Sequence, residues 1–262
     1  MNAGLLALSA AGACAGAAAW AAVAPSSQLF GSTLRHTPDA SQIALTFDDG
    51  PNPACTPELL KLLERYRAPA TFFLVGRAAR ACPNLVREIA DRGHNIGNHT
   101  ETHANLTWLP AWRIADELEA CQDSILRGLG FERGAAPILM RPPFGYRGPQ
   151  LWSAIRRVGL RAVAMWSLSC YDWKPQPAAR LIQRLGRVVI RNQQVAAGGE
   201  PARRVNDKRR STGGEIIVLH DGDARELLAD RQHVVAALEY WLPRWRDAGF
   251  EFVTMNPLAD AL

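Results

Sequence analysis

Short apolar runs alternate with longer amphipathic runs along most of the chain. Seven short runs rich in β-branched and aromatic residues are predicted as strands, at 43–47, 70–75, 94–98, 138–141, 161–167, 215–219 and 251–254. The longer runs are predicted as helices, several with proline in the first turn, at 57–66, 83–92, 111–129, 148–158, 177–191 and 225–248. Because seven such strands suit a closed or nearly closed barrel better than an open sheet, we expect an α/β fold, a distorted (β/α)7-type barrel in one domain.

Residues 1–34 differ from the rest, because no charged side chain precedes Arg35 and residues 3–24 are all apolar or small. This stretch is long enough to span a bilayer, but it lacks a basic start and its many alanines make it weakly hydrophobic. Cleavage after Ala21 or Ala24 fits a signal peptide, although Pro25 would hinder the latter. A cleaved signal, a retained membrane anchor and a helix packed on the domain all remain open. The first two predict an exported protein, periplasmic or extracellular, with its catalytic domain at 35–262.

The composition is that of an ordinary globular domain, with 48% hydrophobic and 21% charged residues among 262. The five cysteines show no C-x-x-C spacing, which argues against a zinc ribbon or a thioredoxin-type site. In an oxidising compartment Cys55 and Cys82 could form a disulfide, since each lies just ahead of a predicted helix. Separate buried thiols at Cys55, Cys82, Cys121 and Cys170 are the alternative.

The net charge of +5 is concentrated between residues 180 and 210. We interpret this region as a solvated helix face followed by a surface loop at 193–214, and attraction to anionic envelope material or a membrane surface as a second hypothesis. No nucleic-acid partner is expected, because zinc-finger spacing and RNP-like aromatic motifs are absent from the sequence. The basic residues concerned are Arg180, Arg184, Arg187, Arg191, Arg203, Arg204, Lys208, Arg209 and Arg210.

Polar residues follow the ends of several predicted strands. Asp48 and Asp49 end the first strand, and His99, Arg141 and His220 end or follow three others. In a β/α barrel the carboxyl ends of the strands converge on one mouth. We therefore expect these residues, scattered through the sequence, to meet in one site.

Three of the residues in these motifs could bind one metal ion. His99 and His103 are four apart, as on one face of a helical turn, and Asp49 would complete a set of two histidines and one carboxylate with positions left open for water. Zinc suits these ligands best, with cobalt, nickel or iron(II) as alternatives. Asp48, pointing elsewhere, could accept a proton from water. Taken alone, the Asp-Gly-Pro sequence indicates only a turn, and the histidine pair could lie on an exposed helix face.

Two further motifs complete a known pattern, Arg141-Pro142-Pro143-Phe144-Gly145 and Val218-Leu219-His220-Asp221. With them the chain resembles the polysaccharide deacetylases of carbohydrate esterase family 4, also called the NodB homology domain, from about residue 43 to 255. The resemblance implies that Asp48 is the general base and that Asp49, His99 and His103 are the metal ligands. It also implies that Arg141 pairs with the base.

The same resemblance implies roles in the other half of the site. The backbone N–H of Phe144 would stabilise the oxyanion, and His220 would be the general acid, held by Asp172. Trp173 and Val218 would line the acetyl pocket. Without the resemblance, Trp173 would be interpreted as a core residue and His220 as a structural histidine.

Two positions depart from the family pattern. Ser169 stands where many members have an acid, so support for the general acid is weaker. Val218 stands where many have leucine and still suits a methyl-sized pocket.

The expected reaction is metal-dependent N-deacetylation of an N-acetylated cell-envelope or extracellular glycan, such as peptidoglycan, poly-N-acetylglucosamine or a chitin-like polymer. The alternatives are an O-deacetylase on acetylated xylan, a deformylase on a lipid-linked amino sugar, and a catalytically silent glycan-binding domain. Trp108, Trp112 and Trp152 could stack on sugar rings or pack in the core. A monomer is expected, with membrane attachment through the N-terminal segment as an option.

Overall fold

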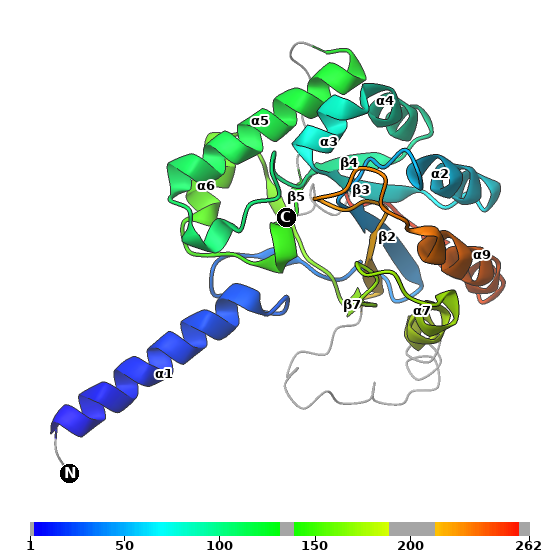
Figure 1. Ribbon diagram of the computed structural model, residues 1–262. Coiled ribbons are helices and arrows are strands. Elements are labelled where there is room, and N and C mark those ends of the chain that lie inside the picture. The colour runs from blue at the N-terminus through cyan, green and yellow to red at the C-terminus, as the bar shows by residue number, and fades with distance from the viewer. Residues whose placement is uncertain (1–2, 132–138, 189–212, 257–262) are drawn as a thin grey trace.

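The apolar runs form the strands of a single parallel sheet (Figure 1). The computed structural model describes residues 3–131, 139–188 and 213–256. β2 is buried along nearly its whole length, as expected for a parallel strand covered on both faces. The strands are β1 (Thr33–Leu34), β2 (Gln42–Asp48), β3 (Ala70–Leu74), β4 (Asn95–Asn98), β5 (Leu139–Met140), β6 (Ala162–Ala164), β7 (Leu168–Ser169), β8 (Glu215–His220) and β9 (Glu251–Phe252).

The sheet curls so that its two ends approach each other. Its strand order is β1-β6-β5-β4-β3-β2-β8-β7, with β9 paired to the start of β2. β6 and β7 lie near opposite ends of this order, yet only residues 165–167 separate them in the chain. Met165 N–H donates to Leu34 O at 2.8 Å, and Ser167 N–H donates to Ile216 O at 3.0 Å. The short segment therefore joins both ends, and the expected α/β barrel is confirmed.

Amphipathic helices cover the outside of the sheet (Figure 1). α2 turns Leu59, Leu60 and Leu63 inward and has proline in its first turn, and α5 ends at Gly130 with a left-handed φ of 82°. The helices are α1 (Ala3–Val23), α2 (Thr56–Arg65), α3 (Gly76–Ala81), α4 (Pro83–Asp91), α5 (Ala111–Leu129), α6 (Leu151–Arg157), α7 (Ala178–Leu185) and α9 (Gln232–Asp247), with 3-10 turns η1 (Leu106–Trp108) and η2 (Pro143–Gly145).

Three predicted elements differ from the observed ones. The strand expected at 161–167 is divided into β6 and β7, because the chain changes partner strands between them. The helix expected from 225 begins at Gln232, because buried Arg231 bonds Gly222 O at 2.8 Å and Asp223 at 2.9 Å and holds the preceding residues in a turn. The helix expected at 177–191 is α7, and residues 189–191 lie outside the described part, as does most of the predicted loop at 193–214.

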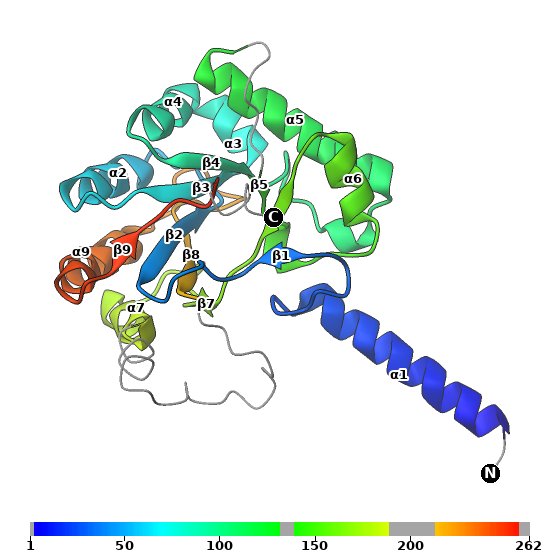
Figure 2. The same ribbon diagram turned by 180° about the vertical axis from the view of Figure 1, so that it is seen from behind.

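The N-terminal helix α1 extends away from the barrel in both views (Figures 1 and 2). Side chains 12–20 are exposed, whereas Ala21 is fully buried. Among the described helices, none combines the length and apolar character needed to cross a membrane. The helix expected at the start of the chain is thus present, with its last turn against the domain.

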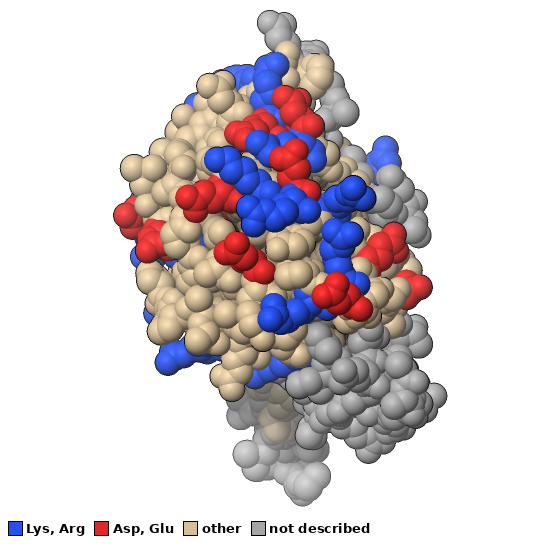
Figure 3. Space-filling model, turned by 90° about the vertical axis from the view of Figure 1, so that its right-hand side faces the viewer, with Lys and Arg blue, Asp and Glu red and all other residues tan. Residues whose placement is uncertain are grey.

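The face covered by α2 and α9 carries charges of both signs (Figure 3). Arg65 pairs with Glu239 at 3.5 Å across the two helices, and Arg92 pairs with Glu88 at 2.9 Å and with Glu64. Exposed pairs of this kind contribute little to stability and leave no dominant sign on this face. Most of the basic region predicted at 180–210 lies outside the described residues.

All five cysteines are free thiols, so the prediction of a disulfide between Cys55 and Cys82 is wrong. Both residues do precede helices, as predicted, at the starts of α2 and α4. Cys55 is instead buried, with its thiol 3.9 Å from Arg231 O. Cys121 and Cys170 are also buried, whereas Cys82 is half-buried, so the alternative of separate buried thiols holds for three of the four cysteines.

Candidate active site

The turn after β2 sends two neighbouring carboxylates in different directions. Asp48 is the last residue of β2 and is buried, and Asp49 follows with a left-handed φ of 71°. This conformation is unusual for a residue other than glycine and is often found at functional sites. Asp48 meets Arg141, whereas Asp49 meets His99 and His103. The two carboxylates are therefore placed as expected, so that Asp49 can bind a cation while Asp48 can accept a proton.

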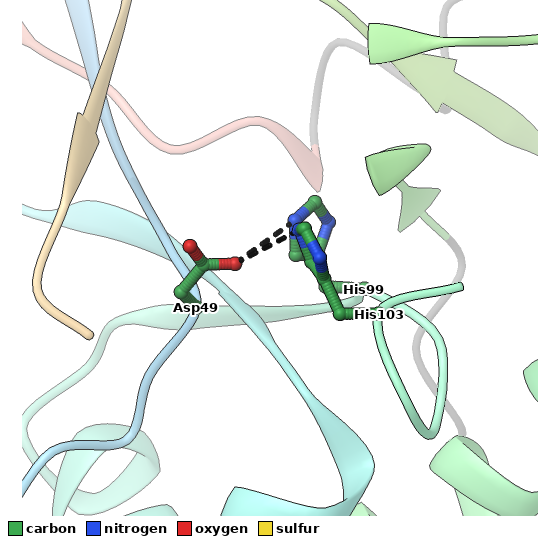
Figure 4. A group of neighbouring side chains, drawn as sticks. All are labelled: Asp49, His99 and His103. Atoms are coloured by element: carbon green, nitrogen blue, oxygen red, sulfur yellow. Dashed lines mark ion pairs between the residues drawn. The ribbon is translucent and has the colours of Figure 1, made fainter. Parts of the chain in front are cut away.

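Asp49, His99 and His103 form a compact group in which both imidazole rings face the carboxylate (Figure 4). Asp49 Oδ1 lies 3.4 Å from His99 Nε2 and 3.2 Å from His103 Nε2, and the three possible ligand atoms lie within 4.8 Å of one another. The same Oδ1 is buried and accepts no hydrogen bond. A buried acceptor without a donor, beside two imidazole nitrogens, fits a divalent cation.

The protonation states of this group also favour a cation. His99 Nδ1 donates to Arg141 O at 2.7 Å, because a carbonyl can only accept, and this leaves Nε2 as a free electron pair facing Asp49. Burial and the neighbouring His99 lower the pKa of His103 to about 4. Burial alone would raise the pKa of Asp49, but its contact with His99 and the positive charge of the nearby His220 hold it well below its usual range. Asp49 and His103 are therefore in the forms that bind a cation at neutral pH, and His99 turns its Nε2 toward the same point.

The two histidines do not lie on a helical turn, which corrects the expectation from their spacing. They belong to the loop after β4, where Thr100 and His103 adopt left-handed φ values of 66° and 60°. The loop is tied to α5, because Glu101 N–H donates to Glu117 O at 3.1 Å and the Glu117 carboxylate accepts from Thr102 N–H at 2.9 Å. The imidazoles meet because the loop folds back, with ring centres 5.1 Å apart.

Asp48 is held by a fully buried arginine. Arg141 Nη1 donates to Asp48 Oδ1 at 2.8 Å and to Thr46 Oγ1 at 2.7 Å, and Nη2 donates to Met165 O at 3.1 Å. Burial lowers the pKa of Arg141 while Asp48 raises it, and a guanidinium stays charged through such shifts. The hydrogen bond from this guanidinium fixes the orientation of the Asp48 carboxylate. Arg141 is thus in the centre of the barrel and not on the surface.

His220 at the end of β8 is paired with Asp172. Its Nδ1 lies 3.1 Å from Asp172 Oδ1, and its backbone N–H donates to the other carboxylate oxygen at 2.7 Å. Burial alone would lower the pKa of His220, but Asp172 outweighs it and raises the pKa to about 9. His220 is therefore protonated at neutral pH, as a general acid requires.

The remaining predicted residues lie around these two pairs. Trp173 is 41% exposed, with its ring centre 5.9 Å from that of His220. Val218 is buried in β8, two residues before His220 and hence on the same face. Phe144 is left-handed at φ 60°, and its ring packs edge-on against His103 at 4.6 Å. Ser169 pairs with Val218 in the sheet and supplies no acid.

The three tryptophans proposed as sugar platforms have different surroundings. Trp108 and Trp112 are 84% and 53% exposed, so both remain available for stacking. Trp152, on α6, is instead half-buried and packs against a core cluster and against Gly31, where an added Cβ would lie 1.5 Å from its Nε1. Of the two interpretations given for Trp152, the structure favours core packing.

Four residues near the site carry no motif that sequence reasoning could use. Glu117 and Glu101 hold the histidine loop, and Arg80 pairs with Glu101 at 2.6 Å. His233 on α9 donates from Nε2 to Asp172 O at 2.9 Å. Their roles depend on how α5 and α9 pack, which periodicity does not reveal.

A barrel whose mouth combines a three-ligand cation site, an arginine-held carboxylate and a protonated imidazole has the parts of a metal-dependent hydrolase. The polysaccharide deacetylase family model matches residues 35–163. The chain is 34% identical to the peptidoglycan-N-acetylglucosamine deacetylase of Bacillus cereus over 82% of its own length and 87% of the relative's. It is 32% identical to a chitooligosaccharide deacetylase of Bradyrhizobium, over 80% of this chain and 86% of the relative.

A solved structure of a deacetylase is also similar to this chain. A peptidoglycan N-acetylglucosamine deacetylase in complex with a naphthyl-substituted N-oxidanyl-benzamide is similar with a TM-score of 0.67 and 29% identity, covering 86% of this chain and 91% of that one. The chain belongs to the polysaccharide deacetylase family, which confirms the resemblance carried by its motifs.

Proposed function

We propose that this protein is a metal-dependent hydrolase that removes N-acetyl groups from amino sugars of a cell-envelope glycan, with N-acetylglucosamine residues of peptidoglycan as the first candidate. The observation that carries the proposal is the divergence of Asp48 and Asp49, which gives one carboxylate to a cation and the other to a proton. The family relatives named above support this substrate class. The basic net charge of +5 favours an anionic polymer over neutral chitin.

Asp49, His99 and His103 would hold the cation, and zinc suits this ligand set best. When bound, the cation would supply Lewis acidity to the acetyl carbonyl and lower the pKa of water beside it. Cobalt, nickel and iron(II) suit the same donors and remain alternatives.

The chain's own residues then complete the hydrolysis. Asp48 takes a proton from water as the water oxygen attacks the acetyl carbonyl, while Arg141 keeps the carboxylate oriented. The backbone N–H of Phe144 donates to the carbonyl oxygen as it becomes negative. His220 gives its proton to the sugar nitrogen, so that acetate and a free amine leave. Trp173 and Val218 line the space that would hold the acetyl methyl group.

For the rest of the molecule we propose an exported protein, periplasmic or extracellular. Residues 1–34 would form a leader with a short linker and 35–262 the catalytic domain. We also propose a monomer, and attachment to a membrane through the N-terminal segment as an option.

The test is acetate release after removal of metal by a chelator and addition of zinc. Peptidoglycan, chitin oligomers, acetylated xylan and a lipid-linked amino sugar serve as substrates, with His220→Ala as the control. We expect release from an N-acetylated glycan only when zinc is present. Release from xylan alone would indicate an O-deacetylase, and formate from the lipid-linked sugar a deformylase. Binding of glycan without release of acid would indicate a silent binding domain.

A further inference from the structure

The end of α1 and the residues that follow it form a segment docked on the barrel, here the docked segment, residues 21–34. Ala21 is fully buried and Ser27 is 2% exposed, although the preceding side chains of the helix stand in solvent. Gly31, at φ 110°, leaves no room for a side chain against Trp152. β1 then pairs with β6 at the edge of the sheet. The segment thus keeps contact with the barrel from the last turn of α1 to the first strand.

One buried arginine holds the first half of this segment. Arg147 is 1% exposed, and its backbone N–H donates to Ala22 O at 3.0 Å. Its Nη2 donates to Ala24 O at 2.8 Å and to Ser27 O at 2.7 Å. These carbonyls belong to the last turn of a helix and the turn after it, where a cation and its N–H donors are most favourable. Without them, a buried guanidinium would lack compensation for its lost hydration.

The same arginine contacts the Pro143–Gly145 turn, which carries the Phe144 N–H. Arg147 Nη1 contacts Gly145 O at 3.4 Å and the sulfur of Met165 at 3.6 Å. Gly145 follows Phe144 directly, and both are left-handed, at φ 70° and 60°. A Cβ on Gly145 would lie 2.5 Å from the Trp166 ring, so the turn is closely packed on its other side. The docked segment and the N–H of Phe144 therefore depend on one side chain.

We propose that Arg147 is a positioning residue that couples docking of residues 21–34 to the Pro143–Gly145 turn, so that the protein acts with this segment retained. The part that concerns catalysis rests on the proposed function, because it assigns the Phe144 N–H to the oxyanion. Cleavage after Ala24 would remove two of the carbonyls that Arg147 holds, and cleavage after Ala21 would remove the buried methyl group. The N-terminal end of the active protein therefore lies at or before Ala21.

The first test compares two identical substitutions on one helix in the full-length, zinc-loaded protein. Ala21→Tyr should displace the docked segment, whereas Ala18→Tyr, at an exposed position, should not. For Ala21→Tyr we expect kcat to fall about 10- to 100-fold, as when an oxyanion donor is misplaced, with zinc affinity and KM within about threefold of the parent. The backbone amides of Gly145 and Tyr146, which donate to Pro142 O and Pro143 O, should exchange hydrogen faster. Ala18→Tyr should match the parent protein in every measurement.

The second test changes the arginine itself. Arg147→Gln should lower kcat and unprotect the same amides, Arg147→Lys should restore part of both, and exposed Arg156→Gln should change neither. Unchanged amide exchange in Ala21→Tyr and Arg147→Gln would overturn the coupling, as would a parallel loss of zinc affinity, which indicates general unfolding. So would a mature N-terminus beyond residue 21 in the native host. If the parent protein releases no acetate, the proposed function fails, while amide exchange still decides the coupling.

Discussion

At the residue scale, the site assigns opposite requirements to neighbouring groups. Asp49 must stay ionised and without a hydrogen-bond donor, whereas His220 must stay protonated although it is buried. His99 and the positive charge of His220 keep Asp49 ionised, and Asp172 keeps His220 protonated. Perturbed protonation of this kind is a feature of catalytic sites.

Replacing the carboxylate ligand should remove metal and activity together. Asp49→Asn keeps the size of the side chain but removes its charge, so we expect zinc binding to weaken by more than about 100-fold. Titration calorimetry with zinc and acetate release measure the two effects. Asp91→Asn, exposed at the end of α4, is the matched control and should leave both unchanged. Full activity in Asp49→Asn would contradict its assignment as a ligand.

The pH dependence of turnover should reflect His220. Its protonated form is the active one, so kcat should be level on the acid side of the pKa and fall tenfold per pH unit above it. The fall should begin at or below a pH of about 9, the pKa of His220. A bound cation would offset the negative charge of Asp49, which contributes to raising that pKa. Asp172→Asn should move the fall about 1 to 3 pH units lower. A pH profile of kcat that is the same in both proteins would contradict the assignment.

At the element scale, the loop after β4 depends on α5 for its shape. The Glu117 carboxylate accepts hydrogen bonds from both the backbone N–H and the hydroxyl of Thr102. Glu117→Ala should therefore weaken zinc binding about 10- to 100-fold, as is usual for groups that orient metal ligands. Glu119→Ala, exposed two residues along the same helix, is the control. Equal zinc affinity in the two variants would show that the loop keeps its shape unaided.

The strands of four or more residues and most helices could be predicted from the sequence, because their apolar spacing extends over enough positions. β1 and α3, with 2 and 6 residues, are not predicted, because neither lies within a longer run of regularly spaced apolar residues. The ligand residues could be named from their motifs. The left-handed loop that joins His99 to His103 could not, because it depends on contacts with α5, far along the chain.

At the scale of the whole molecule, one seam joins the two ends of the curled sheet. Ser167 Oγ accepts from Ile216 N–H at 2.9 Å, beside the main-chain bond between the same residues. Ser167→Ala leaves that N–H without its acceptor, so we expect a loss of about 1–3 kcal/mol in the free energy of unfolding. Urea denaturation measures it, with exposed Ser153→Ala as control. Equal stability of the two variants would show that the seam closes without this hydroxyl.

Five of the six non-glycine residues with left-handed backbones in the described part of the chain lie at one end of the barrel. Asp49, Thr100, His103, Phe144 and Tyr171 all follow strand ends at the mouth. Each such conformation costs on the order of 1 kcal/mol and is maintained by its neighbours. Substitutions that relieve this strain at the mouth are therefore expected to raise thermal stability but to lower turnover. Engineering for thermal robustness will find more freedom at the opposite end of the barrel, where Arg67, before β3, is the one such residue in the described part of the chain and none of the proposed catalytic groups lies.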